Sequence, residues 1–186
     1  GLAVLHTQAR RITIELAKND YSRMNPMTAN CRLYSFVHTM LKPIQHGIQT
    51  AHVLGVIAHD ALDMATLASP EHMSMKDAEF VDLVRDYVCM DHTIIVLDGG
   101  VSAQLTDIAT TISEYAKLLN LPYGTFHEDH ASMCGMMTAV GILVPESIWA
   151  LDPKAIAASV AISVDPNPLT SPDVSVESKL RYYLST

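Results

Sequence analysis

The chain of 186 residues lacks the features that several classes of protein require. No apolar run approaches the ~18 residues of a membrane-spanning helix, and the apolar stretch at residues 1–5 is too short for the core of a signal peptide. The three cysteines, Cys31, Cys89 and Cys134, are scattered and form no CxxC pair, which favours reduced thiols over a disulfide framework or a zinc site. We therefore expect a cytoplasmic protein without membrane attachment.

Positive charge is also scarce. Twelve Lys and Arg residues face twenty Asp and Glu residues, which gives a formal net charge of −8. Tight nonspecific binding to nucleic acid depends on many contacts between Lys or Arg and phosphates, so the composition argues against it. The sequence also contains no GxGxxG, P-loop, GxSxG or HExxH motif, so it gives no support to the nucleotide-binding and hydrolase classes that those motifs mark.

Apolar residues make up 49% of the chain, which is enough for a substantial core. Runs of strand-forming residues and 3.6-residue periods predict an α/β fold in three α/β/α layers, with a small mixed four-stranded sheet. The first two strands should be parallel because helices connect them, and the last two should form a hairpin. We expect an N-terminal extension at 1–31, a core at 32–149 and a C-terminal extension at 150–186. The expected strands are 32–40, 93–97, 123–127 and 138–144, and the expected helices are 4–20, 43–58, 74–88, 102–119 and 178–184.

Local patterns add expectations about the helices. Ser74 and Ser102 are predicted N-caps. A glycine pair, Gly47 and Gly55, lies eight residues apart on one side of the first core helix and predicts close packing on the sheet. The apolar face of that helix is predicted from five residues at spacings of three and four, namely Ile44, Ile48, Ala51, Gly55 and Ala58.

The segment from Pro43 to His52 is the most informative candidate site. It follows an apolar strand and opens a helix, and helix N-termini at the end of a sheet present N–H groups that suit anions. Gln45 and Gln49 lie four residues apart, so both amides share one flank of the helix. His52 and His59 follow on the same helix, and the alternative is that both are ordinary helix residues with satisfied ring nitrogens.

The segment His127-Glu128-Asp129-His130 is a second polar cluster. Neighbouring residues of an extended chain point in opposite directions, so the four side chains cannot all converge on one metal ion. We expect no metal and no cofactor. A carboxylate or histidine that faces a ligand and a simple solvated loop are the two alternatives.

The order of these motifs resembles the type II peptidyl-tRNA hydrolase family over roughly residues 32–149, and more closely its divergent members from bacteria and phages. Gln49-Thr50-Ala51-His52 is similar to the family's Gln-Cys-Ala-His helix motif, and Leu119-Asn120-Leu121-Pro122 resembles its Gly-Leu-Pro turn. The strand that begins at Met137-Thr138 resembles the family's Thr-bearing strand. The resemblance implies the same fold.

The resemblance also implies roles for individual residues. Asp129, with Glu128 beside it, would orient a water molecule, and Thr138 would bind the carbonyl or phosphate. The family's catalytic lysine falls on Gln45, which supplies no positive charge, and Lys42 could replace it only if the turn bends inward. The residues expected at the site are Asp129, Thr138 and Gln45 for catalysis and Lys42, His46, Gln49, His52, His127, Glu128 and His130 for ligand binding.

Two functions follow as hypotheses. The first is hydrolysis of the ester of peptidyl-tRNA at a degenerate site. The second is a non-catalytic protein that sequesters a nucleotide-derived small molecule, which in a phage would act against host defence in the host cytoplasm. A homodimer is the expected assembly, because the extensions carry apolar residues that the core alone would not cover, namely Ile12, Ile14, Leu16, Ile156, Val160 and Ile162.

Overall fold

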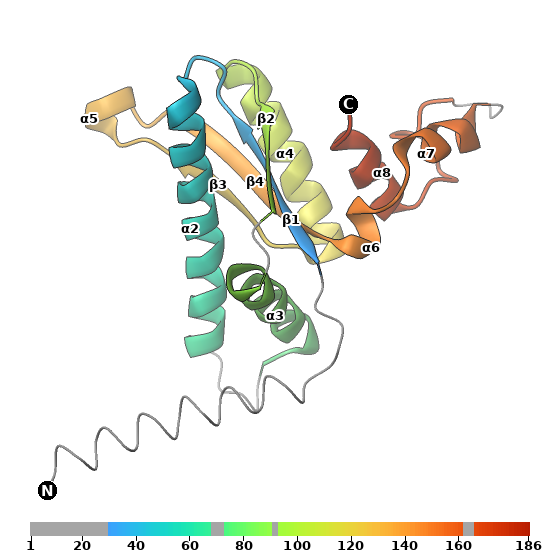
Figure 1. The fold of residues 1–186 in the computed structure, drawn as a ribbon, viewed down its shortest axis with the longest axis horizontal. Coiled ribbons are helices and arrows are strands. Elements are labelled where there is room, and N and C mark those ends of the chain that lie inside the picture. The colour runs from blue at the N-terminus through green and yellow to red at the C-terminus, as the bar shows by residue number, and fades with distance from the viewer. Residues whose placement is uncertain (1–29, 68–72, 91–92, 162–165) are drawn as a thin grey trace, which may run out of the picture.

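The computed structural model describes residues 30–67, 73–90, 93–161 and 166–186. A four-stranded sheet with the order β2-β1-β4-β3 forms its centre (Figure 1). β1 runs parallel to β2 and antiparallel to β4, and β3 is antiparallel to β4. The predicted mixed sheet, its parallel crossover and its closing hairpin are therefore confirmed. The strands are β1 (Cys31–Val37), β2 (Thr93–Asp98), β3 (Tyr123–His127) and β4 (Met137–Pro145).

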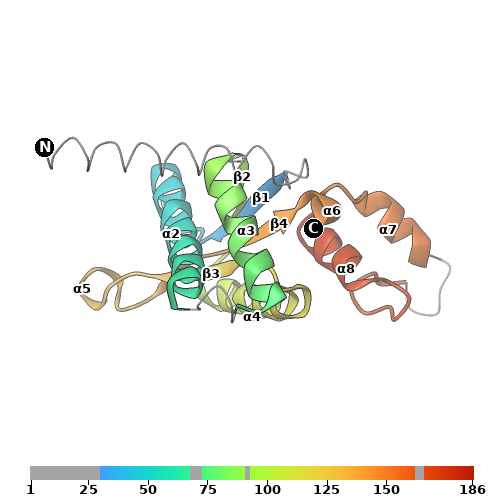
Figure 2. The ribbon, with the colours of Figure 1, turned by 90° about the horizontal axis from the view of Figure 1, so that it is seen from below.

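Helices cover both faces of the sheet (Figures 1 and 2). α2 and α3 pack on one face, and α4, α6 and α8 pack on the other, so the predicted three layers are present. The expected helix at residues 4–20 lies outside the described residues. The helices are α2 (Pro43–Leu67), α3 (Met75–Cys89), α4 (Ser102–Leu119), α5 (His130–Met133), α6 (Glu146–Trp149), α7 (Pro153–Val160) and α8 (Val176–Tyr183).

The face of α2 that packs on the sheet differs from the predicted one. Its buried residues are Gln49, Thr50, Val53, Ile57 and Ala61. The residues predicted to form the apolar face point largely to solvent, and Ile44 and Ile48 are 75% and 50% exposed. The helix was predicted, but the prediction of which face packs on the sheet was wrong. Two sets of residues recur at helical spacing, and the set that packs on the sheet is the one that includes two polar residues.

The expected close packing of Gly47 and Gly55 is also wrong, since nothing beyond the adjacent residues and backbone of α2 itself lies within 4 Å of a Cβ built at either position. The close approach occurs at a strand glycine instead. A Cβ on Gly141 of β4 would lie 2.8 Å from Cγ1 of Val53 and 3.0 Å from the carbonyl oxygen of Tyr34. The glycine in the strand therefore lets α2 approach the sheet.

The two predicted N-caps have different outcomes. Ser74 caps α3 as expected, and its Oγ accepts a hydrogen bond from the amide of Asp77. Ser102 is the first helical residue of α4, and Val101 is the N-cap. Oε1 of Gln104 accepts the Val101 amide at 3.0 Å, so a glutamine in the first turn takes over the capping role.

The C-terminal segment packs against the rest of the chain. Leu180 of α8 is fully buried in the same cluster as α4 and β4. The guanidinium of Arg32 in β1 lies 3.5 Å from the ring centre of Trp149, and Nε of Arg181 donates to the Trp149 carbonyl at 2.8 Å. Ile156 and Val160, two residues of the extensions that were expected to be uncovered, are buried within the chain.

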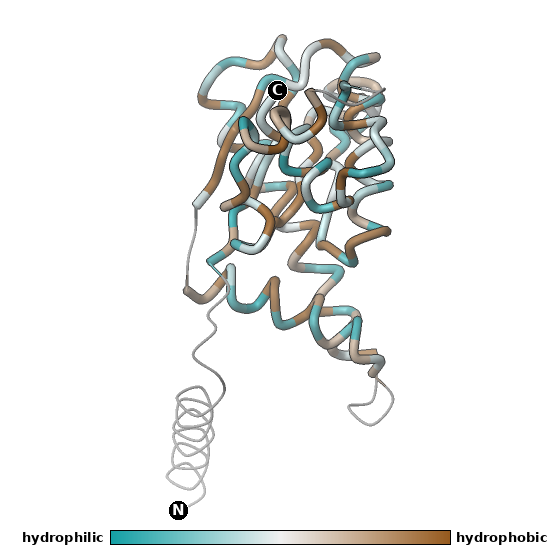
Figure 3. The backbone as a smooth tube through the Cα atoms, turned by 90° about the vertical axis from the view of Figure 1, so that its right-hand side faces the viewer, coloured by the Kyte–Doolittle hydropathy of each residue, from teal (hydrophilic) through white to brown (hydrophobic). Residues whose placement is uncertain are grey.

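Hydrophobic and hydrophilic residues alternate along the helices of the trace (Figure 3). Within the described ranges, no helix combines the length and the apolar character needed to cross a membrane.

Candidate functional site

The candidate site lies where β1 ends, α2 begins and the loop between β3 and β4 returns to the sheet. The amide of His38, the first residue after β1, donates to the carbonyl of Thr138 at the start of β4. This bond joins the two strand ends and brings the polar residues of α2 next to those of the loop. The site therefore combines parts of the chain that are about 90 residues apart in sequence, as the 89 residues between Gln49 and Thr138 illustrate.

Three of the predicted residues form a hydrogen-bonded chain, which we call the Gln49 triad: Thr138, Gln49 and Glu128. Oγ1 of Thr138 donates to Oε1 of Gln49 at 3.0 Å, and Nε2 of Gln49 donates to Oε1 of Glu128 at 2.6 Å. Thr138 is fully buried and Gln49 is 5% exposed. Because the threonine hydroxyl occupies the carbonyl oxygen of the amide, the NH₂ group must face the carboxylate, and Glu128 is held in one position.

Asp129 does not join this triad. Its Oδ1 accepts the amide of Ser132 at 2.7 Å, so the side chain is the N-cap of the short helix α5. This backbone hydrogen bond is the main cause that lowers the pKa of the fully exposed Asp129 carboxyl below its ordinary value, and a hydrogen bond from the Ser132 side chain adds to it. Of the two adjacent carboxylates, Glu128 therefore contacts Gln49, and Asp129 stabilises the loop.

The start of α2 is largely occupied by its own chain. Oε1 of Gln45 accepts the amide of Lys42 at 2.9 Å, and the ring nitrogen Nε2 of His46 donates to the carbonyl of Leu41 at 3.0 Å. The amide of Gln45 donates to the carbonyl of Lys42. Pro43 has no N–H, so only one of the first three helical residues, Ile44, can offer its amide to an anion. This helix start is a poorer anion site than its sequence position suggests.

The histidines of the loop are engaged with the loop itself. Nδ1 of His127 lies 3.2 Å from the carbonyl oxygen of Gly135, and the ring of His130 lies next to the same glycine. Gly135 and Cys134 both adopt positive φ, at 73° and 56°, which turns the chain back toward β4. Neither ring contacts the Gln49 triad.

A groove between α2 and β3 adjoins the triad. His52 stacks on Phe126 with ring centres 4.2 Å apart and an angle of 9° between the planes. His52 is three residues beyond Gln49 on α2, and Phe126 is two residues before Glu128. The His52–Phe126 stack and the Gln49–Glu128 hydrogen bond are therefore neighbouring contacts between α2 and the chain at the end of β3. The groove has a volume of about 360 Å³ and is lined by Ala51, His52, Gly55, Val56, His59, Asp60 and Phe126.

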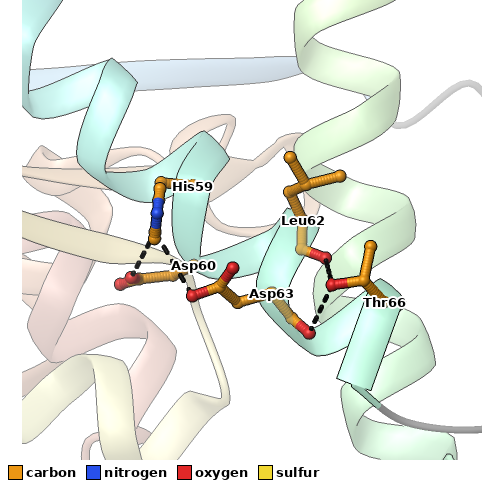
Figure 4. Close-up of polar contacts among 5 residues, drawn as sticks. All are labelled: His59, Asp60, Leu62, Asp63 and Thr66. Atoms are coloured by element: carbon orange, nitrogen blue, oxygen red, sulfur yellow. Dashed lines mark hydrogen bonds and ion pairs between the residues drawn. The ribbon is translucent and has the colours of Figure 1, made fainter.

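His59 and Asp60 also line this groove, and Figure 4 shows their contacts with each other and with Asp63. Nδ1 of His59 lies 3.5 Å from Oδ2 of Asp63 and 4.0 Å from Oδ1 of Asp60. All three side chains are more than half exposed, so these ion pairs contribute little to stability. Asp60 and Asp63 also line a second hollow of about 520 Å³, and no aromatic residue is among its described lining residues.

One polar cluster near the site was not predicted. His38 is 1% exposed, and its Nδ1 accepts the amide of Met40 at 3.2 Å. Nε2 of the neutral ring therefore carries the proton and donates to Oγ of Ser102 at 3.1 Å, and that hydroxyl donates to Sδ of Met136. A histidine nitrogen that donates a hydrogen bond to a serine hydroxyl cannot at the same time accept the proton of that hydroxyl. His38 and Ser102 are therefore not arranged as a general base and a nucleophile. The sequence signal was that both residues follow parallel strands, whose carboxyl ends meet at one edge.

Within the part of the chain that the structure describes, no three His, Cys, Asp or Glu side chains are arranged to hold a metal ion. No protein-family model matches the chain, and no curated protein matches it significantly. The resemblance to type II peptidyl-tRNA hydrolases stays a prediction based on motifs.

Proposed function

We propose that this protein binds a nucleotide-derived small molecule in the groove between α2 and β3 and does not hydrolyse it. The observation that carries the proposal is the parallel stack of His52 on Phe126 in the wall of that groove. Stacking on flat side chains is the sequence-tolerant way in which proteins hold nucleobases, and it is worth about 1–3 kcal/mol per base.

The dimensions of α2 support this use of the groove. His52 and His59 are seven residues apart, so their Cα atoms are separated by about 10.5 Å along the helix axis. Gly55 lies between them and has open space where a side chain would be. A base that stacks on His52 would lie over Gly55, and the exposed carboxylate of Asp60 would accept a hydrogen bond from an exocyclic amino group.

The hydrogen bonds of the site argue against hydrolysis. Gln45, at the position of the family's lysine, accepts from the backbone of Lys42, and Asp129 caps α5. The residue at the position of the catalytic positive charge and the residue expected to orient water are thus both hydrogen-bonded to nearby backbone amides. Loss of one electrostatic group that stabilises a transition state costs about 3–4 kcal/mol in the barrier.

The test is isothermal titration calorimetry and thermal melting with a panel of mono-, di- and cyclic nucleotides. At least one nucleotide should bind and raise the melting temperature, and His52→Ala should weaken its binding by about tenfold to a hundredfold, which corresponds to the stacking energy. His127→Ala is the control, since this histidine contacts the loop and should leave the affinity unchanged. If no nucleotide binds, or if both variants bind as tightly as the wild type, the proposal is wrong.

Ester hydrolysis of peptidyl-tRNA is a second candidate, because the Gln49 triad brings together the helix glutamine, the strand threonine and a carboxylate. In this case Glu128, rather than Asp129, would hold the attacking water. Cleavage of an N-blocked aminoacyl-tRNA should then be abolished in Glu128→Gln and retained in Asp129→Asn. Purified protein without cleavage activity would exclude this candidate and leave the binding proposal intact.

A further inference from the structure

The edge strand β2 presents an apolar surface that the described part of the chain does not cover. In the residues that the structure describes, β1 is the strand that pairs with β2, and no strand pairs with the other edge. The hydroxyl of Tyr87 donates to the carbonyl of Thr93, the first residue of β2. Ile95 and Leu97 pack on the core under α4. Ile94 and Val96 point to the opposite face and are 44% and 43% exposed.

The edge lacks the features by which proteins prevent pairing of their edge strands. Lysine, proline and β-bulges are the usual protection, and the segment Ile94–Leu97 contains none of them. The opposite edge of the sheet differs, because β3 has an irregularity between Phe126 and His127 and lies beneath α2. The two edges are therefore not equivalent, and β2 is the aliphatic edge strand whose pairing has no register shift.

We propose that β2 pairs antiparallel with β2 of a second copy of this chain, around a two-fold axis perpendicular to the sheet at Ile95. Residues that lie opposite one another in an antiparallel pair share a face of the sheet. With Ile95 on the axis, Ile94 of one copy lies opposite Val96 of the other, and this contact occurs twice. The result is an eight-stranded sheet in which the exposed apolar row of each copy covers that of its partner.

The charge distribution selects this register. Asp98 is the one charged residue of β2, and it lies beyond the pairs that the register forms. If the axis passed through Val96, Asp98 would instead lie opposite Ile94. The axis at Ile95 thus keeps the carboxylate out of the apolar pairs at the centre of the interface, which matters for two chains that each carry a net charge of −8.

The flanks of β2 are complementary under the same symmetry. Met90, just before the strand, is 60% exposed, and Val101, just after it, is 49% exposed. Met40 is 73% exposed, and its neighbour Thr39 donates its amide to Gly100, which places Met40 near the same end of β2 as Val101. Antiparallel pairing brings Met90 of one copy to Val101 and Met40 of the other, so the contact extends beyond the backbone ladder.

The experiment measures the mass of the full chain by size-exclusion chromatography with light scattering. The wild type should elute as a dimer of the 20.3 kDa chain, and Val96→Lys should be monomeric at the same concentration. Leu118→Lys is the matched control, because this leucine of α4 is 70% exposed and should tolerate a charge without loss of the dimer. Circular dichroism of each variant verifies that it folds.

A second variant tests the register. In a background with Cys89→Ser and Cys134→Ser, an equimolar mixture of the Ile94→Cys and Val96→Cys variants should form a mixed disulfide on mild oxidation, because these exposed residues lie opposite one another, and each variant alone should form much less. A monomeric wild type overturns the proposal, and in that monomer slow hydrogen exchange of the Ile94–Leu97 amides that point away from β1 would assign the edge to another segment of the same chain. A dimer that survives Val96→Lys would also overturn it.

Discussion

The substitution Thr138→Val tests the central hydrogen bond of the site. It removes the hydroxyl that donates to Oε1 of Gln49 at 3.0 Å and keeps nearly the same volume. Both side chains are buried, so the amide oxygen would lose its partner without access to water. A buried polar atom left without a hydrogen bond costs about 1–3 kcal/mol, and we expect the free energy of unfolding in urea to fall by that amount.

A double-mutant cycle with Gln49→Leu separates this bond from other effects. In the Gln49→Leu background the amide oxygen no longer exists, so Thr138→Val should cost less than about 0.5 kcal/mol, and the coupling should be about 1 kcal/mol or more. Thr125→Val is the control, since the structure gives the Thr125 hydroxyl no hydrogen bond within its described residues. If Thr138→Val is neutral, or costs the same in both backgrounds, the Gln49 triad does not exist as described.

Three further predictions concern packing and titration. Gly141→Ala should destabilise the protein by about 1–3 kcal/mol, because its Cβ would lie 2.8 Å from a side chain of α2. Gly47→Ala has open space around its Cβ and should stabilise the protein by about 0.5–1 kcal/mol. Urea denaturation measures the free energy of unfolding of both variants. The N-cap hydrogen bond of α5 is complete above the usual pKa of an aspartate and is lost as pH falls through the lowered pKa of Asp129. The NMR signal of the Ser132 amide should follow this titration, and Asp129→Asn should abolish the pH dependence of that signal. Burial raises the pKa of Tyr183. The stability that its neutral phenol confers is present below the ordinary tyrosine pKa and is lost as pH rises through the raised pKa. Ultraviolet difference absorbance should show ionisation of Tyr183 above the usual range, and an ordinary tyrosine titration would contradict this prediction.

The four strands and the helices α2, α3, α4 and α8 could be predicted because each depends on local patterns, whereas the short helices α5, α6 and α7 were not predicted. The strand 123–127 was predicted with the bounds that the structure shows, and the break after Leu119 follows from Asn120, which adopts a left-handed conformation with φ of 54°. The rotation of α2 could not be predicted, because it depends on which side chains fit against β4. A polar pair, Gln49 and Thr50, is buried there because each finds a hydrogen-bond partner on the sheet or the loop.

The partner of Gln49 could not be predicted for a related reason. Along a strand, successive side chains alternate between the two faces, so one inserted residue exchanges the faces of all that follow. The pairing of β3 with β4 shifts register between Phe126 and His127, directly before the two carboxylates. Phe126 pairs with Ala139 and His127 with Met137, so the extra residue is Thr138 of β4, and counting along a regular hairpin misses this irregularity. The structure directs Glu128 to Gln49 and Asp129 to the helix cap. Because these two adjacent carboxylates have different partners, any role transferred to this loop by motif has to be tested on both residues together.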